Sequence, residues 1–454
     1  MYRSEDIDII NSKLDSIINK SYDEYKKHYE PTTDEISQVY KSIKKYIIQK
    51  KFKVYGGFAQ NILLMNKNPK ASIYKIIDGA FYNWPDIADI EFYSPTPIKD
   101  LVEIADELHK EGFKHVKIQH GVHEGTYKLF INFLGYCDVS YMPLHLYNNL
   151  KTIDVDGIIC THPHFMVCDA YRVLTDPLTS YWRLHKAMRF NNLLNYYPIG
   201  NNTIYTNLKF GKVIPEVMKS IRKHLVMNSN MIVIGFYSYD YYSKKINKTE
   251  KREYPYYELI TDNIIKNANK IYKLLKLKYK DKITVKQFVP FFQFTDRRVE
   301  FYYDNNLVLR LYGNNSRCTV YKYSEHKKTY YGTYNLTYMY LLFNNIYYQV
   351  NRNNEYINLY YNLMSNLSIF RNDYLVKHKL SVIDDTPFQD FTFKCTGTAI
   401  DTLRAARVAN VTNQTKKFYY TASNHKIQLP TIYYTNISGN EILESKNYFF
   451  TPSQ

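Results

Sequence analysis

One stretch of the chain occurs twice, and this duplication limits the possible folds more than any other feature. The stretch "VYKSIKKYIIQKKFKVYGGF" begins at Val39 and "VMKSIRKHLVMNSNMIVIGF" begins at Val217; they align without a gap, so that Gly57 falls on Gly235. Each copy has apolar residues at helical spacing, then a short apolar run and a glycine, which predicts a helix, a strand and a turn. Chance similarity between two Lys- and Ile-rich segments is the alternative. A match through three successive elements favours two copies of one domain.

The length of the chain agrees with a duplication, because 454 residues suffice for two or three domains. Helical and strand patterns occur in both copies, and the expected fold class is α+β. We expect four segments: an N-terminal helical segment at 1–34, a catalytic domain at 35–195, a degenerate copy at 196–350, and a mixed helical segment at 351–454 that packs on the second domain.

The charge balance points to a polyanionic partner. Lys and Arg number 60 against 43 Asp and Glu, a formal net charge of +17, which suits nucleic acid or a membrane surface. No apolar run is long enough for a transmembrane helix and no signal peptide is evident, so a soluble, intracellular protein is expected. Five cysteines without a CxxC pair favour a reducing compartment. With 49 tyrosines in the chain, tyrosine-rich stretches are poor evidence of a base-stacking surface.

A glycine turn and three carboxylates form the chemical pattern of the first copy. Gly56 and Gly57 follow a short strand and open a helix, which makes either a simple tight turn or a place where phosphate approaches the backbone. Asp89 and Glu91 are two apart on an expected strand and so share a face, and Asp138 lies in a later strand. Converging carboxylates repel one another without a cation, and Mg²⁺ prefers such oxygen ligands.

These motifs resemble a known family. The series "YGGF", "DIEF" and "YCDVSY" resembles the polymerase-β-like nucleotidyltransferases, and "HPHFMVCDAYRVLTDPLTSYWRLHKAMR" with "INFLGYCDVSYMP" is similar to the poly(A) polymerase catalytic subunit of poxviruses and related large DNA viruses. The likeness is good over roughly residues 35–190. It implies a polymerase-β-like nucleotidyltransferase domain followed by a degenerate one. The spacing from Gly57 to Asp89 exceeds the family's usual spacing, so an insertion is expected at 66–86.

The resemblance implies a template-independent polynucleotide adenylyltransferase that adds AMP from ATP to RNA 3′ ends with Mg²⁺ or Mn²⁺. Asp89 and Glu91 would bridge two metals and Asp138 would complete the catalytic one. The residues expected to bind the nucleotide are Gly56, Gly57, Phe58, Arg183 and Lys186. Two other functions stay open: another RNA nucleotidyltransferase, adding CCA or uridylate, and a non-enzymatic RNA-binding protein on an inactive fold. If viral, the protein is expected in the virion and host cytoplasm.

Several other motifs have plainer explanations. "DIDI" at Asp6 and "DVDG" at Asp154 repeat the acid–apolar–acid pattern, but the first reads as an acidic helix start and the second as a turn. Arg183, Lys186 and Arg189 form a basic helical stripe that is either a phosphate contact or a solvated face. A buried helix start explains the next group better than a zinc site does; its members are Cys160, His162, His164 and Cys168.

The second copy has lost most of the pattern. Ile234 falls at Gly56, Tyr256 at Asp89 and Glu258 at Glu91, and no equivalent of Asp138 is evident in "LVLRLYG". We therefore expect a degenerate domain that serves structure, RNA or dimer contacts. Closed two-fold dimers are the commonest oligomers, and a homodimer that uses residues after 200 is expected.

Overall fold

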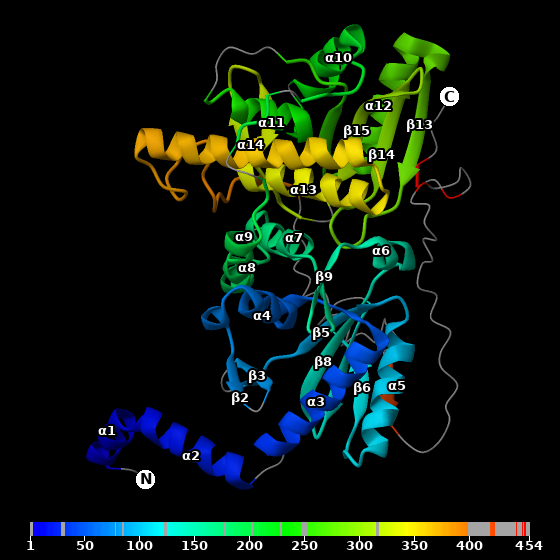
Figure 1. The fold of residues 1–454 in the computed structure, drawn as a ribbon. Coiled ribbons are helices and arrows are strands. Elements are labelled where there is room, and N and C mark those ends of the chain that lie inside the picture. Colours follow the sequence, from blue (N-terminus) through cyan, green and yellow to red (C-terminus); the bar gives the residue numbers. More distant parts are fainter. Residues whose placement is uncertain are drawn as a thin grey trace. The chain divides into compact units, whose positions relative to one another are not determined.

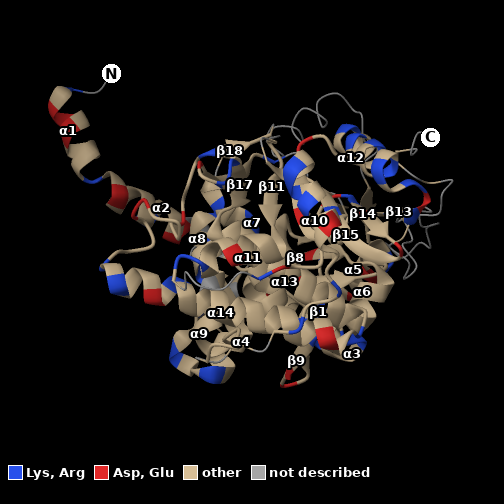
Figure 2. Cartoon of the chain, turned by 90° about the horizontal axis from the view of Figure 1, so that it is seen from above, with Lys and Arg blue, Asp and Glu red and all other residues tan. Residues whose placement is uncertain are grey.

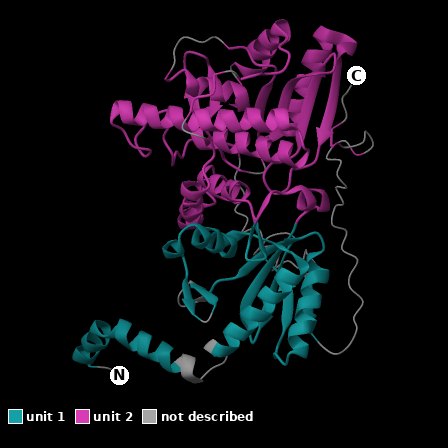
Figure 3. Ribbon diagram, in the orientation of Figure 1, with its two compact units in different colours: residues 1–141, 154–160, 416–431 teal, residues 142–153, 161–415, 432–454 magenta. Residues whose placement is uncertain are grey.

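A computed structural model gives the fold, and its described parts are residues 3–28, 32–77, 79–83, 86–121, 125–176, 178–200, 203–206, 208–227, 229–246, 252–314, 317–397, 418–422, 442, 447 and 449–450. The chain is α+β, as predicted, with helices packed on mixed sheets (Figure 1). It forms two compact units (Figure 3): residues 1–141, 154–160 and 416–431 in unit 1, and residues 142–153, 161–415 and 432–454 in unit 2. The domain boundaries expected from the sequence stay a prediction.

Unit 1 is built on a mixed sheet in the order β19-β6-β7-β8-β5-β1-β10-β9. Its strands are β1 (Lys53–Val54), β5 (Ile90–Ser94), β6 (Lys117–His120), β7 (Thr126–Ile131), β8 (Leu134–Tyr141), β9 (Thr152–Val155), β10 (Ile158–Thr161) and β19 (Tyr419–Thr421). The helices are α1 (Ser4–Ser12), α2 (Leu14–His28), α3 (Thr33–Lys50), α4 (Gly56–Lys67), η1 (Pro69–Ala71) and α5 (Pro97–Lys110). The expected insertion forms a small antiparallel sheet of β2 (Lys75–Ile77), β3 (Ala80–Asn83) and β4 (Asp86–Ile87).

Unit 2 repeats this sheet in the order β13-β14-β15-β12-β11-β17-β16-β18. Its strands are β11 (Ile232–Ile234), β12 (Tyr257–Thr261), β13 (Ile283–Phe288), β14 (Arg298–Tyr303), β15 (Asn306–Gly313), β16 (Thr319–Ser324), β17 (Thr329–Gly332) and β18 (Cys395–Thr396). The helices are α6 (Leu144–Asn149), α7 (Pro163–Leu174), η2 (Tyr181–Arg183), α8 (Leu184–Asn191), α9 (Leu193–Tyr196), α10 (Pro215–Ile221), η3 (Arg222–Val226), α11 (Gly235–Ser243), α12 (Ile264–Tyr279), η4 (Lys280–Lys282), α13 (Tyr334–Val350) and α14 (Asn354–His378).

Strand pairing supports the duplication but corrects its register at the glycine turn. Val54 lies opposite Phe92, and Val233 lies opposite Leu259, so Val54 corresponds to Val233. The ungapped alignment pairs Val54 with Ile232, and the second copy therefore has one extra residue before this strand. Gly56 therefore corresponds to Gly235, which also begins a helix with positive φ, and not to Ile234. The helix before the second strand ends in a π-helical turn, η3, which accommodates one residue more than an α-helical turn. The extra residue thus leaves both helix and strand intact.

The tyrosine-rich stretches of unit 2 form core. Tyr242, Tyr254 and Tyr360 are essentially inaccessible, and their hydroxyls have internal partners, which for Tyr254 is the Asp240 carboxylate (3.4 Å). Tyr242 donates to the Gly332 carbonyl (2.8 Å), and the hydroxyls of Tyr256 and Tyr360 are 2.9 Å apart. This packing agrees with the expectation that tyrosine-rich stretches are poor evidence of a base-stacking surface in this chain.

The C-terminal part of the chain supplies an edge strand to each sheet. β19 pairs with β6, where Tyr420 donates a hydrogen bond to Asp106, and β18 pairs with β16. A disulfide joins Cys318 to Cys395 beside the β16–β18 pair, which the odd cysteine count did not suggest. Within the segment expected to be of mixed helical character, the sequence "GTAIDTLRAARVAN" also predicts a helix, and all of it after Gly397 lies outside the described residues.

Candidate active site

The three predicted carboxylates come together on two neighbouring strands of unit 1. β5 and β8 are parallel, and Glu91 stands directly opposite Asp138 in their register. Asp89 immediately precedes β5 and shares the face of Glu91, because side chains alternate along an extended chain. The side chain of Asp89 is 39% exposed and that of Asp138 is 19% exposed. The cluster is therefore open to solvent on the Asp89 side.

A lysine that the sequence did not single out lies among these acids. Lys128 on β7 stands opposite Asp138 on β8, and its Nζ lies 2.7 Å from Asp138 Oδ1 and 3.5 Å from Asp89 Oδ2. Its ammonium group balances the negative charge that the two aspartates share. The signal in the sequence was weak, since "TYKLFI" has its lysine where a solvated strand would also have one.

Burial and neighbouring negative charge both disfavour the ionised form of Asp138. Burial, together with the charge of Asp89, raises the pKa of Asp138 to about 6, although Lys128 acts in the opposite direction. Such a raised pKa is typical of carboxylates placed to share a cation. As placed, no three His, Cys, Asp or Glu side chains among the described residues are gathered tightly enough to hold a metal ion. Instead, the carboxylates of Asp89 and Asp138 pair with the ammonium group of Lys128. The carboxylate of Glu91 accepts a hydrogen bond from the N–H of Gly57 in the glycine turn.

The glycine turn receives the carboxylate of Glu91. The N–H of Gly57 donates to Glu91 Oε2 (2.5 Å) at the N-terminus of α4, where main-chain N–H groups have no helical partners. Gly56 has a φ of +66°, and a Cβ there would clash with the Glu91 carboxylate. Both observations explain why this position needs glycine. The turn therefore donates a hydrogen bond to an anionic group in this structure, which is the property needed to bind a phosphate.

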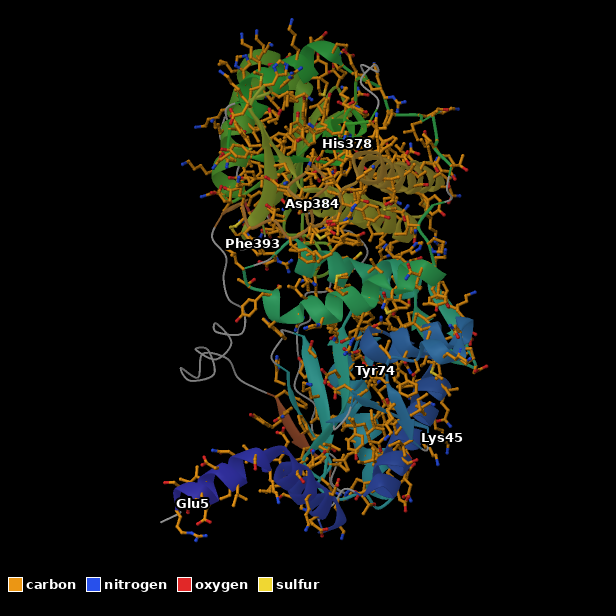
Figure 4. The ribbon with its side chains drawn as sticks, turned by 90° about the vertical axis from the view of Figure 1, so that its left-hand side faces the viewer. Glu5, Lys45, Tyr74, His378, Asp384 and Phe393 are labelled. Carbon is orange, nitrogen blue, oxygen red and sulfur yellow. A yellow bond between two sulfur atoms is a disulfide. The ribbon has the colours of Figure 1, made fainter. Side chains whose placement is uncertain are left out.

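The second glycine lies against a residue from the insertion. A Cβ on Gly57 would clash with the hydroxyl of Tyr74, which lies just before β2 (Figure 4). Tyr74 was not predicted as a site residue, because an inserted segment gives no motif by which to recognise it. It brings a hydroxyl to the first turn of α4 from the small sheet.

The other predicted nucleotide-binding residues belong to the other unit or lie inside the core. Phe58 is fully buried and packs against Phe81, with ring centroids 5.4 Å apart, so only its main-chain amide can take part in nucleotide binding. Arg183 and Lys186 belong to unit 2, on η2 and α8, where Arg183 lies over the ring of Trp182. Their contact with a nucleotide stays a prediction.

The His and Cys group has the plainer role favoured by the sequence. His162 caps α7 by accepting from the His164 N–H (3.2 Å), and His164 Nε2 lies 3.1 Å from the Tyr197 carbonyl. Burial lowers the pKa of His162 to about 3 and that of His164 to about 4. Cys160 and Cys168 are buried thiols with raised pKa values. Neutral imidazoles and protonated thiols in these positions serve packing and helix capping.

Unit 2 has an ion-pair network at the position of the acid cluster. Glu258 on β12 stands opposite Arg310 on β15, and Arg310 stands opposite Glu300 on β14. In unit 1 the same register positions are Glu91, Asp138 and Lys128. The acid on β8 and the base on β7 in unit 1 have therefore exchanged places in unit 2, where the base is Arg310 on β15 and the acid is Glu300 on β14. The alignment of the two copies had not identified Arg310 as the counterpart of Asp138.

The network in unit 2 is closed to solvent. Arg310 lies 3.1 Å from Glu258 and 2.7 Å from Glu300, and Asn344 bonds to both Arg310 and Glu258 at 3.1 Å. Burial raises the pKa of Glu258, whereas Arg310 and Arg298 lower that of Glu300. A guanidinium group fills the place where a metal would be needed, so this copy has no catalytic site of the unit 1 type.

A duplicated sheet with a glycine turn facing carboxylates on adjacent strands defines a nucleotidyltransferase-type protein. Residues 41–180 match the family model of the poly(A) polymerase catalytic subunit, and residues 191–451 match the model of the C-terminal part of the mimivirus (APMV) poly(A) polymerase catalytic subunit. The chain belongs to the viral poly(A) polymerase catalytic subunit family. That family implies a nucleotide substrate and a divalent metal, with RNA and ATP as substrates of polyadenylation.

Individual relatives extend over most of the chain. A poly(A) polymerase catalytic subunit of Acanthamoeba polyphaga mimivirus is 30% identical over 99% of this chain and 84% of its own length. One from African swine fever virus is 28% identical over 36% of this chain and 34% of its own length. The crystal structure of the Megavirus polyadenylate synthase has a TM-score of 0.81 at 30% identity, covering 92% of this chain and 86% of that one. No helix in the described part of the chain is long and apolar enough to cross a membrane.

Proposed function

We propose that this chain is a template-independent polynucleotide adenylyltransferase whose chemistry takes place at Asp89, Glu91 and Asp138. The observation that carries the proposal is the convergence of these acids, from β5 and β8, beside a glycine turn that already accepts a carboxylate. The family supports the activity, and the geometry supports these residues as its site. Action in the virion and host cytoplasm is proposed on the viral relatives.

Although their side chains are not gathered tightly enough to hold a metal as placed, the three acids have the chemistry that suits a divalent cation, and we propose Mg²⁺ or Mn²⁺. Asp89, Glu91 and Asp138 would hold it, since hard cations prefer carboxylate oxygens. When bound, the metals would activate the RNA 3′-hydroxyl and stabilise charge on the transferring and leaving phosphates. The raised pKa of Asp138 and the ammonium of Lys128 beside it support a site made for positive charge. Lys128 would have to give way or turn to a phosphate when the metal enters.

The glycine turn would hold the triphosphate. The N–H of Gly57, now bonded to Glu91, would be released to a phosphate oxygen once Glu91 binds metal. Gly56 permits the close approach, and the amide of Phe58 lies in the same helical turn. Arg183 and Lys186 are proposed as further phosphate contacts from unit 2, on the basis of their charge and spacing.

Primer extension with each nucleotide offered singly tests the function. With an unstructured RNA primer and Mg²⁺, we expect long tails with ATP alone and little extension with CTP, UTP or GTP. Efficient addition of uridylate, or of a short CCA end only, would identify another nucleotidyltransferase. Salt-sensitive RNA binding without release of pyrophosphate from any nucleotide would identify a non-enzymatic RNA-binding protein.

We also propose a homodimer whose contacts involve residues after 200. Unit 2 retains the fold but not the acid cluster, so its surface is available for other contacts. Sedimentation of the purified chain should show a dimer at micromolar concentration, in low and in moderate salt. A monomer under both conditions would refute the proposal without affecting the catalytic site.

A further inference from the structure

The duplicated fold contains two equivalent helix pairs whose surface charges differ. In unit 1 the pair is α3 and α5, and in unit 2 it is α10 with η3, and α12. Glu91 and Glu258 fix the match between α5 and α12, and both helices then begin at corresponding residues, Pro97 and Ile264. The core positions of the two helices agree, since Ile104 and Ile271 correspond and both are buried.

In unit 1 the two helices neutralise one another. Lys50 on α3 pairs with Glu103 on α5 at 2.8 Å, Tyr46 donates to the same carboxylate at 2.8 Å, and Ser42 donates to Glu111 at 2.6 Å. A groove of about 460 Å³ between them has lysines and acids on its walls, with Lys45 among the lysines (Figure 4). This face is of mixed charge.

In unit 2 the acids of the second helix are replaced by lysines. Glu103 corresponds to Lys270 and Asp106 to Lys273, while Lys99 remains a lysine, Lys266. These three lysines are spaced by four and three residues, so they form one exposed stripe opposite the buried residues of α12. Among the described residues of α12 there is no acid, and no ion pair of the described residues involves the three lysines.

The neighbouring helix has kept its basic residues. Lys41 and Lys44 of α3 correspond to Lys219 and Arg222, and both of the latter are exposed. Figures 1 and 2 show α10 beside α12, and Figure 2 marks Lys and Arg along both. The Tyr279 hydroxyl of α12 bonds to the carbonyl of Glu216 on α10 (3.4 Å), which joins the helices. We call the surface made by these residues the basic face: Lys219, Arg222, Lys223, Lys266, Lys270 and Lys273.

We infer that the basic face binds the phosphate backbone of single-stranded RNA. The lysine bias of the chain does not account for it, because α5 has the same core pattern and carries acids at the corresponding positions. Apart from Glu216 in the first turn of α10, the charged side chains of the two helices are basic, and such a concentration of positive charge favours binding of a polyanion. An extended RNA strand fits this row of point charges, and lysine contacts to phosphate carry no sequence preference. The inference rests on the proposed function only for the identity of the polyanion.

Charge reversal on α12 tests the basic face in the full-length protein. We expect K266E/K270E/K273E to weaken binding of a long unstructured RNA about tenfold or more. The negative slope of log K against log salt should become shallower by about 2, because three phosphate contacts are lost. Binding is measured by fluorescence anisotropy in EDTA without ATP, and thermal denaturation establishes that the variant is folded. K266R/K270R/K273R should bind like the wild type.

A matched control variant distinguishes loss of the basic face from the change in the net charge of the protein. K13E/K20E/K377E changes the same number of exposed lysines elsewhere and should leave RNA affinity within about twofold and the salt slope nearly unchanged. Equal losses in both triple variants, or unchanged RNA binding in K266E/K270E/K273E, would overturn the inference; a face used for protein or lipid gives the latter result. Because binding is measured without catalysis, failure of the wild type to add AMP would refute the proposed function and leave this result standing.

Discussion

Replacing Asp89 by Ala is expected to reduce RNA tail synthesis by about 10³-fold or more while leaving the fold intact. The reason is that Asp89 is proposed to hold both metals, whose charge stabilisation is worth several kcal/mol in the transition state. The ion pair of Asp89 with Lys128 is a long one, with 3.5 Å between Oδ2 and Nζ, and the Asp89 side chain is 39% exposed. The free energy of unfolding should therefore change by less than about 1 kcal/mol. Primer extension with ATP and Mg²⁺, beside thermal denaturation, measures both effects.

An acid of the same unit provides the control. Glu107 on α5 is exposed and pairs with Lys110 at 2.7 Å, so Glu107→Ala also removes one carboxylate and one surface ion pair. It should keep full tail synthesis. If Asp89→Ala retains more than about a tenth of the wild-type rate, the chemistry lies elsewhere, because losing a shared metal ligand removes more stabilisation than that.

The acids of unit 1 could be predicted because their types and spacing are required by chemistry. Asp89 and Glu91 sit two apart on a strand, and Asp138 sits among apolar neighbours, which are patterns that a single sequence displays. The helix of α12 and the hairpin of β14 and β15 were likewise predictable, since periodicity and the Asp304-Asn305 turn, with both φ positive, are local.

What the sequence could not reveal depended on register between strands far apart in the chain. Lys128 enters the acid cluster only because β7 pairs with β8 in one register. Arg310 replaces Asp138 only because β15 pairs with β12 in the equivalent register. A lone arginine in the apolar run "LVLRLYG" was the one available signal. The one-residue shift in the alignment at Gly235 was hidden for another reason. The π-helical turn η3 takes up the extra residue, so the hydrophobic patterns of the helix before it and of the strand after it are unchanged.

Replacing Arg310 by Met is expected to lower the free energy of unfolding by about 3–5 kcal/mol, since it leaves Glu258 and Glu300 buried beside each other without their shared guanidinium. Tail synthesis per folded molecule should stay within about twofold of the wild type, because this network contains no substrate-binding residue of the proposed site. Equilibrium denaturation in urea, with activity measured on the folded fraction, gives both quantities.

The double variant E258Q/R310M distinguishes a charge effect from lost packing. Removing one acid and one base restores neutrality, so its stability should exceed that of R310M, contrary to the sum of two independent losses. The register partner in unit 1, Asp138, should behave in the opposite way. Asp138→Asn should abolish activity, yet its free energy of unfolding should be equal or higher, because burial and the charge of Asp89 disfavour the ionised carboxyl and outweigh the pairing with Lys128. If R310M is as stable as the wild type, the network is not a replacement for the metal site. If folded R310M has lost activity, unit 2 takes part in catalysis and is not a degenerate copy.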